Sequence, residues 1–222
     1  MKKNNAVIIL LSIILAVGAI LWFKQFQTEN KILKQIIERL KADSRAAEVL
    51  VAGVNFDETT RKTLTTIKFL EYDTKGDPLS PRYFTFTGNI IQFQALVIRF
   101  EDIQLRFANE LKGKSAYLFW KVFMLDGKNT QEFEITPMEE IPLGYKLENI
   151  KNSFEKKLWE QFWAYALDPK KAKQENIRNA QIEAPGTIFI PGYLYTIKIE
   201  HDGGLRIDSS KLPPILKGEK VL

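Results

Sequence analysis

The chain has 222 residues, a net charge of +5 and no cysteine. Its 45% hydrophobic content excludes wholesale disorder and leaves room for one domain of ordinary size with accessory segments. Without cysteine there is no disulfide framework, thiolate metal site or cysteine nucleophile. Because the 32 basic and 27 acidic residues are interleaved along the chain, nucleic acid is not indicated as a partner.

An uncharged apolar run predicts a transmembrane helix over residues 6–23, directly after a short basic leader at residues 1–5. In a helix this run would reach roughly 27 Å, close to the hydrocarbon thickness of a bilayer. A signal peptide cleaved near Val17-Gly18-Ala19 is the alternative. A count of the basic residues on the two sides would place the long side inside. The basic leader directly before the apolar run has the form of a signal anchor, so we predict a single pass through the cytoplasmic (inner) membrane, with the N-terminus inside and the body in the periplasm or outside the cell.

The segment 24–49 contains neither glycine nor proline and predicts a helical stalk or a short coiled coil. Apolar residues recur there every seven positions, at Phe26, Leu33, Leu40 and Ala47. An amphipathic helix docked on its own domain is the alternative that this pattern leaves open. In the stalk interpretation, Leu33, Ile36 and Leu40 are candidate contacts for a protein partner or for a homo-oligomer.

Residues 50–208 predict a β-rich globular domain, because the hydrophobic pattern changes to a period of two. Strands are predicted over residues 63–73, 83–107 with a break near Gly88-Asn89, 115–125, 131–136, 186–190, 193–200 and 205–208. Strands follow strands through hairpin-like turns, which favours antiparallel pairing over a doubly wound sheet. The predicted fold class is α+β: a transmembrane helix and helical stalk, then a mostly antiparallel β domain with one long covering helix.

That covering helix is predicted over residues 147–167, where apolar residues recur at spacings of three and four before Asp168-Pro169. Covering the open face of the sheet is the favoured interpretation. Trp159 and Trp163 exceed what one packing stripe requires, so they form a second candidate interaction surface. Residues 209–222 are predicted to be an extended tail.

The segment ANELKGKS, residues 108–115, ends in the Gly-Lys-Ser of a phosphate-binding loop but has Ala108 where that motif has its first glycine. A phosphate-binding loop requires a helix that begins at the serine. The bulky and aromatic residues after Ser115 predict a buried strand instead. We therefore predict a turn at Gly113 and no nucleotide.

No catalytic, cofactor-binding or metal-binding residue is predicted. His201 is the only histidine, which excludes a site with several histidines, and its neighbours Gly203-Gly204 indicate a hairpin end. The acid pairs Glu101-Asp102 and Glu139-Glu140 could bind a cation only if they lie in loops. The serines lack a nucleophile-elbow context, so an enzyme is not favoured.

These features predict a membrane-anchored extracytoplasmic structural or assembly protein that acts through protein–protein contacts in an envelope complex. The alternative is a membrane-tethered binding or sensing module for a small apolar or carbohydrate-like ligand, since the chain has 15 phenylalanines, seven tyrosines and four tryptophans. A pocket lined by Trp120, Tyr117 or Phe93 would favour the ligand, and a filled core would favour the protein contact.

Overall fold

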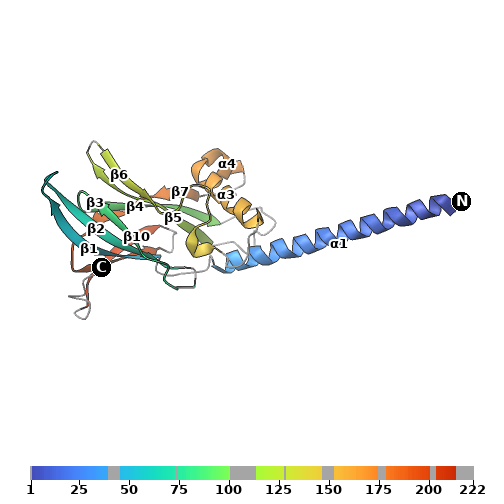
Figure 1. Cartoon of the computed structure of the whole chain (residues 1–222), viewed down its shortest axis with the longest axis horizontal. Coiled ribbons are helices and arrows are strands. Elements are labelled where there is room, and N and C mark those ends of the chain that lie inside the picture. Colours follow the sequence, from blue (N-terminus) through green and yellow to red (C-terminus); the bar gives the residue numbers. More distant parts are fainter. Residues whose placement is uncertain are drawn as a thin grey trace. The chain divides into compact units, whose positions relative to one another are not determined.

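The computed structural model describes residues 2–39, 46–73, 75–100, 114–127, 129–146, 153–174, 179–200 and 204–213. The chain divides into two compact units, Met1–Glu38 and Arg39–Leu222. The first unit is formed by helix α1, Lys2–Arg39 (Figure 1). Trp22 stacks on Phe26 one turn further along this helix, with ring centroids 5.7 Å apart. Large apolar side chains of α1 are exposed, among them Leu11, Ile13, Ile14, Leu15, Val17, Ile20 and Leu21.

The predicted transmembrane helix is wrong. Within the described residues, no helix meets the length and apolarity that a membrane crossing requires. The prediction took residues 6–23 alone, whereas in the structure this run is one part of a longer helix that continues through Lys24, Glu29 and Lys31.

The predicted stalk or coiled coil is also wrong. The helix ends at Arg39, and the last position of the seven-residue pattern, Ala47, is fully buried as the first residue of a strand. Its burial in a sheet explains why an alanine stands there, so no helical seam is needed. Leu33 and Ile36 lie within α1, and Leu40 lies outside the described residues.

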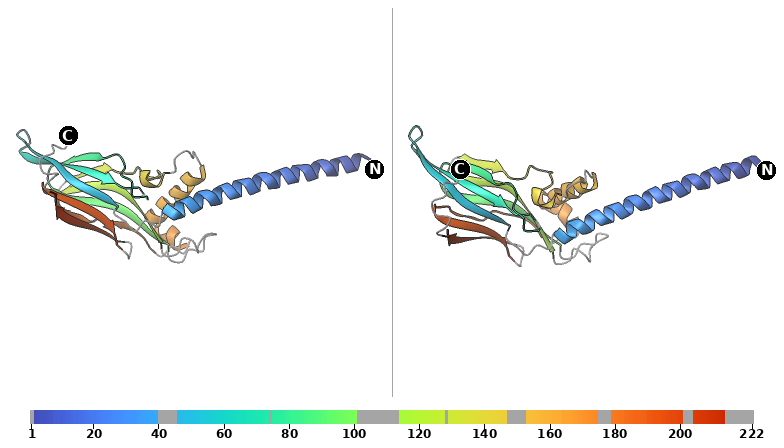
Figure 2. Two further views of the ribbon diagram at one scale, coloured as in Figure 1. Left: turned by 90° about the horizontal axis from the view of Figure 1, so that it is seen from below. Right: turned by 60° about the horizontal axis from the view of Figure 1, so that its bottom comes forward.

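The second unit contains two antiparallel β-sheets (Figures 1 and 2). The first sheet has the order β10-β9-β1-β2-β3. Its strands are β1 Ala47–Asp57, β2 Lys62–Glu71, β3 Arg82–Phe86, β9 Tyr193–Ile199 and β10 Leu205–Lys211. The second sheet has the order β6-β5-β4-β7, and β8 also pairs with β4. Its strands are β4 Ile90–Phe100, β5 Lys114–Asp126, β6 Asn129–Glu134, β7 Asn179–Glu183 and β8 Gly186–Ile188.

The described part of the chain is therefore mostly antiparallel β, and the α+β class is wrong. The class combined N-terminal helices over residues 6–49 and one long covering helix with the β domain, but strand β1 begins inside the segment predicted to be helical. In β1 the buried positions are Ala47, Val49 and Val51, which is the alternation of a strand with one face on a core.

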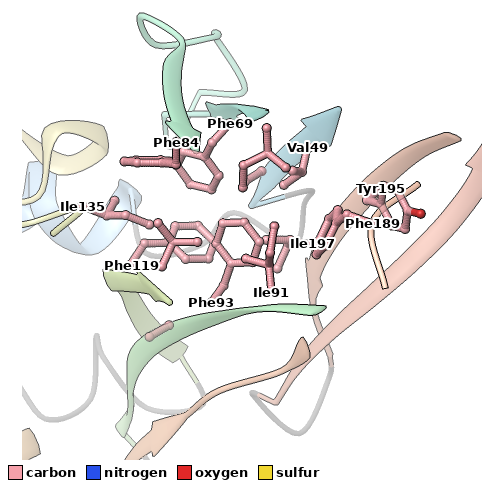
Figure 3. Packing of buried hydrophobic residues seen from close by; sticks show 14 of the residues in the cluster. Val49, Phe69, Phe84, Ile91, Phe93, Phe119, Ile135, Phe189, Tyr195 and Ile197 are labelled. Atoms are coloured by element: carbon pink, nitrogen blue, oxygen red, sulfur yellow. The ribbon is translucent and has the colours of Figure 1, made fainter. Parts of the chain in front are cut away.

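A core of aromatic and aliphatic side chains lies between the two sheets (Figure 3). Phe69 of β2 stacks on Phe93 of β4 with ring centroids 5.4 Å apart. It also meets Phe119 of β5 edge-on at 5.3 Å. Offset stacks and edge-to-face contacts are the favoured arrangements of aromatic rings, so this centre is filled by well-packed side chains.

Side chains join the two sheets where β3 lies beside β6. The Arg82 guanidinium donates a hydrogen bond to the carbonyl of Ile135, which follows β6. The side-chain amide of Gln131 donates to the Thr87 hydroxyl at 2.8 Å, and its carbonyl accepts from the Thr87 backbone N–H at 2.9 Å. These contacts occupy backbone groups beside the two edge strands, which limits the pairing of another strand there.

Side chains also join the sheets on the side of β8 and β9. The Tyr195 hydroxyl of β9 donates to the Ile188 carbonyl and accepts from the Ile190 N–H, both at 2.9 Å. Its ring packs against Phe189, with centroids 4.4 Å apart. One side chain therefore ties the first sheet to β8 of the second.

The helices of the second unit are the 3-10 helix η1 Leu143–Tyr145, α3 Ser153–Leu167 and α4 Pro169–Gln174. Helix α3 packs against β4 and β7 of the second sheet. A bulge in the β4–β5 pairing leaves Trp120 without a residue opposite it, since Gln94 pairs with Lys121 and Ala95 with Phe119. The Trp120 ring meets Trp163 of α3 edge-on at 5.7 Å. The bulge thus presents to the helix a side chain large enough to pack against it.

Candidate functional site

A buried carboxylate lies at the end of β2. Glu71 is only 5% exposed. The guanidinium of Arg82 on β3 forms an ion pair with its Oε2 atom at 3.3 Å. The 3-10 helix η1 also lies close to this carboxylate. A Cβ added at Gly144 of η1 would be 3.7 Å from Glu71 Oε1. Glu71 is therefore enclosed by the chain's own residues.

Burial raises the pKa of the Glu71 carboxyl to about 7, and the Arg82 guanidinium opposes this rise. Burial likewise lowers the pKa of Arg82, and the Glu71 carboxylate opposes that change. For both groups the loss of hydration outweighs the mutual attraction, as is common for buried ion pairs. Glu71 is thus a carboxyl that changes charge close to neutral pH.

Two tyrosines extend this polar cluster beneath α3. The Tyr145 hydroxyl accepts a hydrogen bond from the Tyr117 backbone N–H at 3.4 Å, and their rings lie 6.0 Å apart. Burial raises the pKa of both phenols above the ordinary value, so both are neutral at physiological pH. The Tyr145 ring also packs on Trp159 of α3 at 4.9 Å. These phenols serve the packing between η1, β5 and α3.

A pocket of about 340 Å³ lies between the loop after β6 and helix α3. Its lining residues are Met138, Glu139, Glu140, Ile141, Lys146 and Lys156. The Trp163 indole N–H donates to the Glu140 carbonyl at 3.0 Å and fixes this loop to α3. Glu71, whose pKa is raised, does not line the pocket. A titratable group with a shifted pKa inside a pocket is the usual sign of a catalytic site. Here the group with the raised pKa, Glu71, and this pocket are separate.

Three aliphatic side chains form an exposed patch on the outer face of the second sheet, which we call the apolar row: Ile90, Leu125 and Ile188. Ile90 of β4 pairs with Ile188 of β8. Gln92 pairs with Phe123, so continuing the antiparallel register by two residues places Leu125 beside Ile90. The neighbours Ile91 and Phe189 are fully buried, so Ile90 and Ile188 lie on the opposite, outward face.

The three side chains of the apolar row are 57%, 62% and 54% exposed, in the order Ile90, Leu125, Ile188. Helix α3 covers another part of the same face, where Leu96 and Leu118 are buried. The apolar row is thus one part of this sheet face that the described residues leave open to solvent, and Ile182 of β7, which is 46% exposed, is another.

No protein family, curated protein or solved structure matches the chain. Within the described ranges, no group of three metal-ligating side chains comes together.

The structure buries two of the predicted contact residues. Trp159 and Trp163 are each 1% exposed: Trp163 packs against Trp120 of the second sheet, and Trp159 packs against Tyr145 of η1. The indole N–H of Trp159 has no hydrogen-bond partner among the described residues, in contrast to that of Trp163. Both tryptophans therefore act in internal packing, and the covering role of this helix is the one observed.

Other predicted features are placed in part. Ser115 lies in strand β5 opposite Arg99, so no helix begins at the Gly-Lys-Ser segment, as predicted. Gly113, His201 and the pair Glu101-Asp102 lie outside the described residues. Glu139-Glu140 lies in a loop and lines the pocket.

The sequence interpretation missed Glu71, Arg82 and the apolar row. A signal for Glu71 exists, because Thr65, Ile67 and Phe69 are the buried positions of β2 and the same period places residue 71 on that face. The apolar row has no such signal. Its residues lie beside other apolar residues, so alternation does not reveal which face is covered.

Proposed function

We propose that this chain is a structural or assembly protein that acts through protein–protein contacts, and that the apolar row is a contact surface. The supporting observations are that Ile90 pairs with Ile188, that the β4–β5 register extended by two residues places Leu125 next to Ile90, and that all three side chains are aliphatic and more than half exposed. Contiguous exposed apolar side chains on a folded domain mark interaction sites more often than isolated ones do. A flat sheet face suits another protein better than it suits a small molecule, which requires a concave site.

The packing of the aromatic residues supports this proposal over ligand binding. Phe93 and Tyr117, two residues expected to line a ligand pocket, are in the core and contact other rings. The pocket beside α3 is lined by aliphatic, acidic and basic side chains instead. The envelope location and the identity of the partner stay predictions.

Replacing Ile90 with glutamine tests the proposal. Ile90 is exposed on the outer face, so the substitution should leave the fold intact while removing apolar surface from the contact. Losing one such side chain from an interface costs on the order of 1–2 kcal/mol, about a tenfold loss of affinity. The matched control is Val54→Asn, which changes an exposed aliphatic residue of β1 in the other sheet.

The measurement is quantitative copurification of proteins with the tagged full chain, followed by titration of the recovered partner against the purified variants. We expect Ile90→Gln to weaken the binding of a partner whose affinity Val54→Asn leaves unchanged. Equal affinity of the partner for the wild type and Ile90→Gln, with both folded by circular dichroism, would exclude the apolar row as the contact.

A further inference from the structure

Strand β10 lies at the outer edge of the first sheet, and its backbone shows which groups face outward. Gly204 O accepts from Glu200 N at 2.7 Å, and Leu212 N donates to Gly192 O at 2.9 Å. In an antiparallel ladder alternate residues bond the same neighbour, so the even-numbered residues of β10 bond to β9. The odd-numbered residues therefore direct their N–H and C=O groups away from the sheet.

The first of these outward groups has a partner. The Leu205 N–H donates to the Glu183 carboxylate of β7 at 2.6 Å. The next three outward positions are Ile207, Ser209 and Lys211, and no described strand pairs with this edge of β10. An unpaired strand edge is a template for adding a further strand, because it presents a row of unused donors and acceptors.

We infer that the outer edge of β10 binds the same edge of a second copy of this chain, antiparallel and centred on Ser209. The three outward positions, which have no partner strand in the described part of the chain, are symmetric about Ser209. A two-fold axis at that residue pairs Ser209 with Ser209 of the other copy and Ile207 with Lys211, which satisfies all three positions on both strands. The bond between Leu205 and Glu183 lies outside this register and is retained.

The charges beside the edge permit this approach. On the outward face Arg206 is held by Asp208 at 2.8 Å and by Glu200 at 2.9 Å, and Lys198 pairs with Asp208 at 2.9 Å. Two basic and two acidic groups balance one another, so two copies meet without a net repulsion. In the proposed register Asp208 lies opposite the Ser210 hydroxyl of the other copy, which can donate a hydrogen bond to it.

This edge belongs to the other sheet from the apolar row and differs from the predicted stalk contact, so the inference is independent of the proposed function. It states that the chain associates with itself through backbone pairing. A failure of the Ile90 experiment would leave it unaffected.

Cysteine crosslinking tests the register directly, because the natural chain has no cysteine. Paired residues at the centre would have Cα atoms about 5.5 Å apart, within disulfide range. Two Ser210 residues would be offset along the strands and lie roughly 8 Å apart, beyond that range. Ser209→Cys and the control Ser210→Cys change neighbouring exposed serines in the full chain. Nonionic detergent limits association through the exposed apolar side chains of α1.

We expect at least about tenfold more crosslinked dimer from Ser209→Cys than from Ser210→Cys under mild oxidation, since only the first pair meets the disulfide distance. Equal crosslinking at both positions, or none at either, would overturn the inference.

A second variant tests the backbone bonds. Ser209→Pro removes an outward N–H at a position where an edge strand tolerates proline, and Ser209→Ala keeps it. In sedimentation experiments the proline variant should be monomeric and the alanine variant dimeric. A folded proline variant that still dimerises as the alanine variant does would refute the strand pairing.

Discussion

Replacing Glu71 with glutamine should change how the stability of the protein depends on pH. Glutamine keeps the shape of the side chain but cannot ionise, so the substitution removes the cost of burying a charge at this position. Burial raises the pKa of Glu71 from its ordinary value of 4.5 to about 7, against the opposing effect of Arg82. Between these two pH values the unfolded chain has released this proton and the folded chain retains it. The free energy of unfolding contributed by Glu71 therefore falls as the pH rises.

The size of the effect follows from the two pKa values of Glu71. Each tenfold change in proton affinity corresponds to about 1.4 kcal/mol. Moving the pKa from 4.5 to about 7 thus changes the contribution of Glu71 by about 3 kcal/mol between pH 4 and pH 8. The free energy of unfolding of Glu71→Gln, relative to that of the wild type, should therefore increase by about 3 kcal/mol from pH 4 to pH 8. The attraction of Arg82 for the ionised Glu71 is already included in the folded-state pKa of about 7, so it makes no separate contribution to this difference.

Urea unfolding followed by tryptophan fluorescence at several pH values measures this difference, because Trp120, Trp159 and Trp163 lie in the packed body. Glu132→Gln is the matched control, since it removes a surface carboxylate that pairs with Lys121. A stability difference between Glu71→Gln and wild type that is constant from pH 4 to pH 8 would contradict the reasoning. A difference that shrinks as the pH rises would show that the attraction of Arg82 outweighs burial.

Two further predictions concern the same end of the sandwich. Arg82→Ala should destabilise the protein by roughly 3–5 kcal/mol at pH 8, where Glu71 is left as an unpaired buried carboxylate, and by less at pH 5, where Glu71 is protonated. Urea unfolding at the two pH values checks this, and an equal loss at both would contradict it. Trp163→Phe should cost about 1–3 kcal/mol more than Trp159→Phe, because only Trp163 loses a hydrogen bond, the one to the Glu140 carbonyl. Equal losses in thermal unfolding would show that this hydrogen bond contributes nothing.

Local patterns were sufficient for the strands and helices whose burial follows a simple period. In β2 the alternation of Thr65, Ile67 and Phe69 with less buried residues is visible in the sequence and is observed in the structure. The predicted covering helix ends where α3 ends, at Leu167, and Asp168 accepts hydrogen bonds from the first backbone N–H groups of α4. These features depend on neighbours along the chain, so they can be read from it.

The features that could not be predicted depend on contacts between distant segments. Ala46 and Ala47 continue a helical pattern, but the structure buries them in a sheet beside Ile197 of β9. Which part of the second sheet remains exposed depends on where α3 is docked. Which strand lies at an edge depends on the order of pairing. A hydrophobic period describes a single element and contains none of this information.

The use of polar groups in the structure bears on what kind of protein this is. Arg82, Gln131 and Tyr195 connect one sheet to the other, and Glu71 is enclosed away from the pocket. The buried polar chemistry is thus occupied in joining the sandwich. Two features of the described residues are available at the surface: an apolar row on the second sheet and a strand edge on the first. Two separate surfaces would allow one chain to pair with a copy while holding a different protein. This arrangement supports the proposed role in assembly over the alternative of a ligand-binding module.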